Sequence, residues 1–257
     1  MFGKCLTYEI KLTWKKMFLL YAVAAVFFIM KVVSDISFNT IDDLSPLASS
    51  LYFISNSLYS VVETALAIYT IFVLCKDYKV TMYSQRGYLT HTLPVKTMSL
   101  FWAKIINGII WCLLTSVFQF ILFIINVFMN RDNKYSISNI FFGLFEELFE
   151  QFKGTMFLPL LFVDVVLFIL MIFMFVTSTY GIGQLSNNHR KGLTIGTGFA
   201  YYVIISIIIN YVVKMLITAE NLTPSKVASV FLIVIAVINV ILYFINRATL
   251  TKYLNLQ

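Results

Sequence analysis

Glu63 is the side chain best placed to do chemistry, because it is a carboxylate in the middle of a long apolar segment. Asn56, Ser60 and Glu63 are spaced at i, i+4 and i+7, so they share one face of a helix. Tyr52 and Thr70 extend this stripe by one turn before it and two turns after it. A carboxylate at such a depth is costly, so Glu63 is expected to face protein or water. The stripe predicts either the wall of a hydrated cavity or a buried structural hydrogen bond.

Further polar side chains interrupt apolar segments later in the chain. Asp164 lies about nine residues into the apolar segment 156–183, where a carboxylate again needs a partner or water. Tyr201 and Asn210 are more loosely spaced in the segment 194–218. For Asp164, a structural hydrogen bond is the interpretation that we favour. All three residues are nevertheless candidates for the same hydrated cavity as Glu63.

The composition indicates which kind of fold must position these groups. Of the 257 residues, 60% are apolar and only 12% are charged, whereas soluble domains average about 25% charged residues. Six stretches reach the length of about 20 mostly apolar residues that a membrane-crossing helix needs. The sequence therefore predicts a single all-α integral membrane domain over residues 1–257. Its spans are expected at residues 17–34, 50–75, 100–129, 156–183, 194–218 and 227–246.

The distribution of basic residues predicts the orientation of the spans and excludes nucleic acid as a partner. The net charge of +7 is divided among short segments between apolar runs, so it forms no continuous basic patch. Most of the 19 lysines and arginines lie on one side if both termini are cytoplasmic, as the positive-inside rule requires. The loops 76–99 and 184–193 are then inside, and the loops 35–48, 130–155 and 219–226 are outside.

No motif for catalysis or for a bound cofactor is found in the sequence. Cys5, Cys75 and Cys112 form neither a CxxC pair nor a disulfide framework, so we expect reduced thiols. With only His91 and His189 available, a metal centre is not expected. We therefore expect that the chain is not an enzyme and binds no cofactor itself.

The glycine pairs of the second half do not form a phosphate-binding loop. Gly181-Ile182-Gly183 and Gly196-Thr197-Gly198 lack both the lysine and the strand–loop–helix context that a GxxxxGK[ST] loop requires. Together with Gly192, these glycines are instead expected to permit close helix packing in the membrane. A glutamate-type membrane protease is excluded as well, because Gln151 stands where its EExxxR motif needs arginine after Glu146 and Glu147.

Two amphipathic segments are expected outside the spans. In residues 1–16, apolar side chains recur every fourth residue while lysines gather on the opposite face, which is typical of a helix lying in the membrane interface. Residues 137–149 have the same kind of apolar face, opposed by Glu146 and Glu150. This second segment predicts a helix at the outer leaflet with an acidic upper face. The alternative is that these charges only solvate one side of the segment.

The cytoplasmic loop between the second and third spans contains the most informative motif. Residues 79–91 are largely polar and are followed by Pro94, which disfavours helix just before it but suits a first helical turn. We therefore expect a short cytoplasmic helix at 79–91, separate from the third span. Such a helix is either a solvated connector or a contact point for a soluble partner.

The run Gln85-Arg86-Gly87-Tyr88-Leu89-Thr90-His91-Thr92-Leu93-Pro94-Val95-Lys96 resembles the signature of type-2 ABC exporter permeases of bacteria. Members of that family typically carry an acidic-basic-Gly-Tyr/Thr-Leu element and then Leu-Pro-Val, and Ala103-Lys104 matches a later Gly/Ala-Lys element. The six-span layout with an N-terminal interfacial helix also agrees. The sequence departs from the pattern at Gln85, where glutamate is frequent, so no salt bridge is implied there.

The resemblance implies a permease that works as a dimer, with a second copy or a paralogue, and that binds cytoplasmic ABC ATPase subunits. ATP and Mg²⁺ would be bound by the ATPase alone. The helix at 79–91 would be the element that couples the ATPase to the spans, which would alternately open a cavity between two permease halves. The coupling residues implied are Gln85, Arg86, Gly87, Tyr88, Leu89, Thr90 and His91. The cavity candidates are Asn56, Ser60, Glu63, Asp164, Tyr201 and Asn210.

The expected cargo follows from analogy and from the character of the spans. Apolar spans and an acidic outer segment favour amphipathic or lipophilic cargo, above all antimicrobial or toxin-like peptides, carried out of a bacterial cell. A lipid or drug exporter permease is an alternative. A membrane anchor or sensor subunit without a transport role is a second alternative, and only the coupling motif distinguishes the exporter from it.

Overall fold

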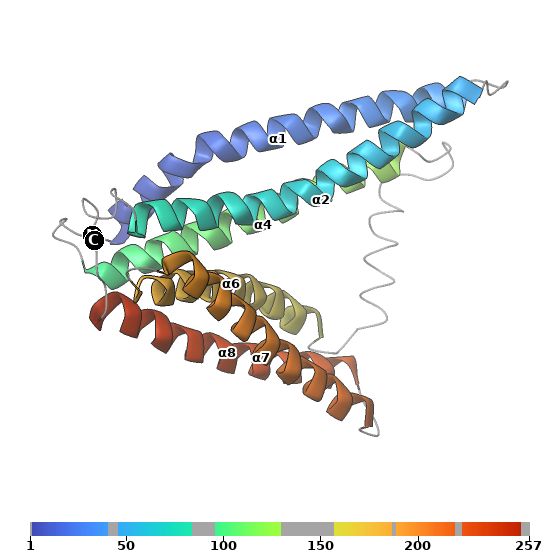
Figure 1. The fold of residues 1–257 in the computed structure, drawn as a ribbon. Helices are drawn as coiled ribbons and strands as arrows, with labels where there is room; N and C mark the ends of the chain where they lie inside the picture. The colour runs from blue at the N-terminus through green and yellow to red at the C-terminus, as the bar shows by residue number, and fades with distance from the viewer. Residues whose placement is uncertain are drawn as a thin grey trace. The chain divides into compact units, whose positions relative to one another are not determined.

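The computed structural model describes residues 2–40, 46–83, 96–129, 157–186, 189–218 and 223–252 of the chain. These residues form six α-helices, labelled in Figure 1. Each described helix contains a window long and apolar enough to cross a membrane. The helices are α1 (Phe2–Thr40), α2 (Pro46–Tyr83), α4 (Thr97–Met129), α6 (Phe157–Gly183), α7 (Arg190–Thr218) and α8 (Pro224–Lys252).

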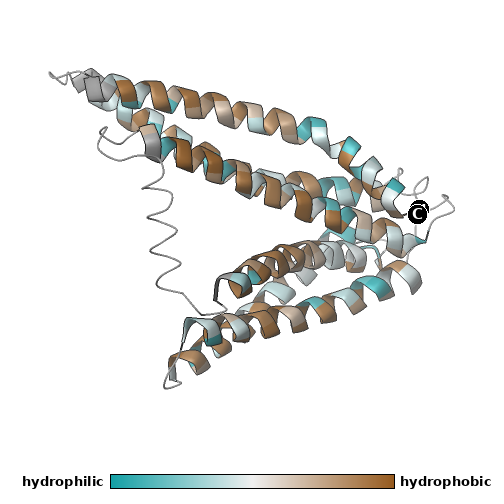
Figure 2. Ribbon diagram, turned by 180° about the vertical axis from the view of Figure 1, so that it is seen from behind, coloured by the Kyte–Doolittle hydropathy of each residue, from teal (hydrophilic) through white to brown (hydrophobic). Residues whose placement is uncertain are grey.

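The helices confirm that the fold is all-helical with six membrane-length segments. Figure 2 shows hydrophobic stretches in the helices, and many large apolar side chains are exposed. In a soluble domain, so many exposed apolar groups would be destabilising, whereas lipid accommodates them. The chain is a multi-pass α-helical membrane protein.

The first two helices are longer than the spans expected from the apolar runs. α1 has 39 residues and α2 has 38, which is roughly 58 Å at 1.5 Å per residue, against a hydrocarbon core of about 30 Å. Residues 2–16 are the first turns of α1 and not a separate helix. Likewise, residues 35–40 and 79–83 continue α1 and α2, where the apolar pattern predicted a loop and the start of a new helix.

The chain groups into two compact units, and α1, α2 and α4 each contribute to both. One unit comprises Thr7–Leu74 and Ile110–Gln151, and we call it the α1–α2–α4 unit. The other comprises Met1–Leu6, Cys75–Ile109 and Phe152–Gln257, and we call it the α6–α7–α8 unit. The prediction that residues 1–257 form a single permease domain stays a prediction.

The α1–α2–α4 unit is held together by aromatic and hydroxyl contacts among its helices. Tyr21 of α1 stacks on Phe118 of α4, with ring centroids 4.9 Å apart, and its hydroxyl hydrogen bonds to Thr115 at 2.9 Å. Trp111 donates its indole N–H to Thr13 at 2.8 Å, so the first turns of α1 are packed on α4. Such polar contacts stabilise helix pairs where lipid gives no hydrophobic driving force.

Two asparagines join α6 and α8 in the other unit. Asn239 donates to the carbonyl of Leu167 at 3.1 Å, and Asn246 donates to the carbonyl of Met174 at 3.0 Å. Both pairs are 72 residues apart in sequence, so the two helices run parallel with one constant offset. We call this pair of contacts the asparagine ladder.

Glycine allows close approach at some of the positions expected. A Cβ on Gly181 of α6 would lie 2.7 Å from Oγ1 of Thr249 on α8, and one on Gly183 would collide with Thr194. By contrast, no described atom lies within 4 Å of a Cβ on Gly192 or Gly196 of α7. The expected packing role is therefore confirmed for the first pair but is not seen, in the described part of the chain, for Gly192 and Gly196.

Candidate functional site

The structure divides the predicted stripe on α2 between two environments. Asn56 points inward and donates a hydrogen bond to Oδ1 of Asp35 on α1 at 3.2 Å. Thr70 is also buried and lies 3.4 Å from the hydroxyl of Thr115 on α4. Ser60 is exposed, and its hydroxyl donates to the backbone of its own helix at Ser57. The five residues therefore do not form one continuous polar surface.

Glu63 lies at the edge between the inward and outward faces of α2. It is partly exposed, and its backbone carbonyl accepts a hydrogen bond from Gln119 of α4 at 2.8 Å. Its carboxylate has neither a hydrogen-bond donor nor an ion-pair partner in the part of the chain that the structure describes. Of the stripe, Glu63 is the group that would gain most from water or from a cationic ligand.

The hydrogen-bond partner of Asn56 belongs to a buried ion pair, which was not recognised from the sequence. Lys31 and Asp35 are one helical turn apart on α1, with Nζ and Oδ2 3.2 Å apart and both side chains 5% exposed. Lys31 also donates to Oδ1 of Asn126 on α4 and lies over the ring of Tyr59 on α2, 5.5 Å from its centroid. The pair therefore joins all three helices of its unit.

The signal that could have found this ion pair is local in the sequence. Opposite charges at i and i+4 in an otherwise apolar segment satisfy each other on one helix face. The sequence predicts an outside loop over residues 35–48. The loop is wrong for Asp35, since α1 continues to Thr40.

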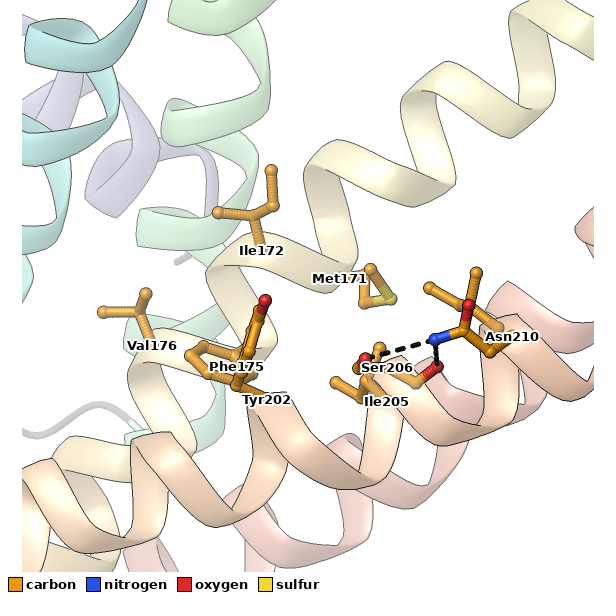
Figure 3. Close-up of a pocket in the computed structure, with 9 residues that line it drawn as sticks. Met171, Ile172, Phe175, Val176, Tyr202, Ile205, Ser206 and Asn210 are labelled. Carbon is orange, nitrogen blue, oxygen red and sulfur yellow. Dashed lines mark hydrogen bonds between the residues drawn. The ribbon is translucent and has the colours of Figure 1, made fainter.

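Asn210 and its neighbours line an apolar groove between α6 and α7. The groove has a volume of about 490 Å³, and it includes Met171 and Phe175 of α6 and Tyr202 of α7. Figure 3 shows the amide of Asn210 turned back along α7, where it donates to the carbonyl of Ser206 at 2.8 Å. Tyr201 is not part of this groove wall, but its ring packs against Phe175 with centroids 5.8 Å apart.

Asp164 belongs to a different groove, between α6 and α8. This groove has a volume of about 370 Å³ and apolar walls that include Phe168 and Phe231. Within the α6–α7–α8 unit, the structure therefore places Asn210 and Asp164 in two different grooves.

The coupling residues Gln85 to His91 lie outside the described residues, as does the acidic segment 137–149. What is described is the helical stem before the coupling residues. Tyr83 at the end of α2 is close to Gly181 of α6, where an added Cβ would lie 3.3 Å from the tyrosine hydroxyl. Tyr78 is buried one turn earlier and meets Phe101 of α4 edge-on. The stem is therefore packed against neighbouring helices and does not project freely.

Comparison with known proteins assigns no family to the chain. No protein-family model, no curated protein and no solved structure matches the chain. Among the described residues, no group of three or more metal-ligating side chains is close enough to hold an ion. What the fold and its polar groups define is a class, the multi-pass helical membrane proteins.

Proposed function

We propose that this chain is the membrane-spanning permease subunit of an ATP-driven exporter of the type-2 ABC kind. The observation that carries the proposal is the run from Gln85 to Lys96, which lies between the second and third of the six membrane-length helices. In a permease of this kind, that position holds the element that contacts the ATPase. The partners proposed are a cytoplasmic ABC ATPase, which binds ATP and Mg²⁺, and a second permease copy or paralogue.

The orientation proposed is that of a cell-membrane protein with both termini in the cytoplasm. Exposed Lys4, Lys11 and Lys15 at the start of α1 are then at the level of the anionic headgroups. Because α1 is longer than the hydrocarbon core, part of it has to leave the core, and the lysines of its first turns favour that end, which supports an interfacial role for residues 2–16.

The stem of α2 is proposed to carry the coupling residues. Tyr78 and Tyr83 hold this stem against α4 and α6, so movement of residues 84–91 would be passed to those helices. The cargo proposed is amphipathic or lipophilic, with antimicrobial or toxin-like peptides first. Glu63, whose carboxylate has no hydrogen-bond donor or ion-pair partner among the described residues, is the group proposed to meet water or a cationic cargo in the transport path.

The test is purification of the tagged chain in mild detergent from the membranes in which it is normally made. The proposal expects an ATPase subunit with a GxxxxGK[ST] motif at a two-to-two ratio, and ATP hydrolysis by the purified complex. Arg86→Glu should lower the amount of bound ATPase at least tenfold without lowering the amount of chain in the membrane. This factor corresponds to about 1.4 kcal/mol, within the range for loss of one charged contact.

The matched control is Lys191→Glu, which reverses an exposed charge on the other predicted cytoplasmic loop. It should leave the ATPase bound. Recovery of the chain with no ATPase, or equal binding by the Arg86 and Lys191 variants, would favour the anchor or sensor function instead. In the assembled complex, Glu63→Gln should lower transport of a cationic amphipathic peptide, and normal transport by this variant would remove Glu63 from the path.

A further inference from the structure

The groove between α6 and α8 combines apolar walls with one carboxyl group. Leu161, Val165 and Phe168 line it from α6, and Ala228 and Phe231 line it from α8, together with Asp164. Its volume of about 370 Å³ is within the range of about 300–1,000 Å³ usual for small-molecule sites.

The groove lies next to the asparagine ladder, which explains why it forms at this end of the helix pair. The first rung of the ladder is the bond from Asn239 to Leu167. Every lining residue of α8 precedes Asn239 by one turn or more. The close contact of Gly181 with Thr249 is at the opposite end. The helices are thus held together at and beyond the ladder, and the groove occupies the part before it.

Asp164 is the feature of this groove that apolar packing does not explain. Its Oδ1 is inaccessible to solvent and has no hydrogen-bond partner among the described residues. No lysine, arginine or histidine of the described chain forms an ion pair with it. Asp164 is partly exposed as a whole, but a carboxylate oxygen that is shielded from water without a hydrogen-bond donor is energetically costly.

The depth of Asp164 in the membrane limits which kinds of ligand could pair with its carboxylate. It is five residues after Pro159, where the candidate span begins, or roughly 8 Å along the helix axis. A group bound there would be just below the headgroups, with the apolar walls extending beside it. A ligand that fits has a cationic head and an apolar tail.

Other occupants satisfy only part of the site. A neutral acyl chain would cover the apolar walls but leave the carboxylate of Asp164 without a hydrogen-bond donor, and an anionic lipid would be repelled by that carboxylate. A bare divalent cation needs several oxygen ligands, and no group of three candidate ligands exists in the described part of the chain. We propose that the groove between α6 and α8 binds a cationic amphiphile, whose ammonium group donates to the carboxylate of Asp164 while its alkyl chain lies against Phe168 and Phe231.

This site does not depend on the exporter function, because binding is measured on the chain alone. The purified chain in phosphatidylcholine nanodiscs is labelled with a C12 alkylamine that carries a photoreactive diazirine, and labelled peptides are located by mass spectrometry. We expect labels on the first turns of α6 and α8. Dodecylamine should compete at least tenfold more strongly than dodecanol, the factor expected for loss of one hydrogen bond to a charged group.

Asp164→Asn keeps the shape of the side chain and should abolish the preference for dodecylamine over dodecanol. Ser206→Ala, on α7 in the groove between α6 and α7, is the matched control and should leave that preference unchanged. Val165→Trp, at an exposed position of the groove wall, should lower labelling at the site by the alkylamine probe. Equal competition by amine and alcohol in the unmodified chain, an unchanged preference in Asp164→Asn, or full labelling of Val165→Trp would each overturn the proposal.

Discussion

Lys31 and Asp35 form the most demanding charged contact of the α1–α2–α4 unit. Two opposite charges buried one turn apart satisfy each other, and Asn56 and Asn126 occupy further hydrogen-bonding positions around them. A buried ion pair of this kind adds little stability over an apolar replacement, but removal of one partner alone is strongly destabilising. Separating α1 from α2 and α4 would therefore remove the partners of two buried charges.

A prediction at this scale concerns removal of one charge. Lys31→Met leaves the Asp35 carboxylate buried beside Asn56 and should lower the free energy of unfolding by about 3–5 kcal/mol. Lys31→Met combined with Asp35→Leu should recover most of that loss, because no unpaired charge remains. Reversible unfolding in SDS measures both. Lys15→Met, which removes an exposed lysine from the same helix, is the control and should change little.

If the double variant were as unstable as Lys31→Met, the loss would come from apolar packing or from the contact of Lys31 with Tyr59. The buried charge would then not be its cause.

At the scale of helices, two glycines differ in the space around them: one lies in a close helix contact, and the other lies on an open helix face. Gly181 is enclosed by Thr249 and Tyr83, whereas Gly192 has no described atom within 4 Å of an added Cβ. The described residues of α7 include none that is buried. The same substitution should therefore have opposite effects on α6 and α7.

Gly181→Ala places a methyl group 2.7 Å from Oγ1 of Thr249 and should lower the free energy of unfolding by about 1–3 kcal/mol through overpacking. Gly192→Ala should raise it by about 0.4–1 kcal/mol, because alanine restricts the unfolded chain. Unfolding of the two variants under identical conditions gives the comparison. A loss in Gly192→Ala as large as that in Gly181→Ala would show that α7 has a close neighbour.

The six described helices could be predicted from the sequence, whereas the contacts between them could not. Long apolar runs require helices in lipid, so all six described helices were expected. The ends of α1 and α2 were misplaced, because helix continues through polar residues such as Lys4 and Lys79 after the apolar pattern stops. The environment of Asn56 depends on Asp35 from another helix. Spacing along one helix contains no information about that partner.

The whole molecule is predicted to have both ends in the cytoplasm, and single cysteines test this. In a chain whose Cys5, Cys75 and Cys112 are replaced by alanine, a cysteine at position 132 should react with a membrane-impermeant maleimide on intact cells. A cysteine at position 189 should react only after the cells are opened. The reason is the excess of lysine and arginine in the loops proposed to be inside.

Labelling of position 189 but not of position 132 on intact cells would invert the proposed orientation. The coupling motif would then be outside the cell, and the exporter function would be excluded together with it. Both cysteines should react after permeabilisation, which controls for the accessibility of each site.

The asparagine ladder also has a consequence for the order in which the chain is built. At about 5–20 residues per second, the 72 residues between the partners take about 4–14 s to synthesise, so α6 is in the bilayer well before α8. Asn239 and Asn246 also donate to carbonyls of their own helix, at Ile235 and Leu242. Each asparagine therefore enters the membrane with one amide hydrogen already bonded and the other still free. α8 can thus insert as an independent helix and still recognise α6 afterwards. Recognition then depends on two hydrogen bonds, from Asn239 and from Asn246, whose positions on each helix are seven residues apart.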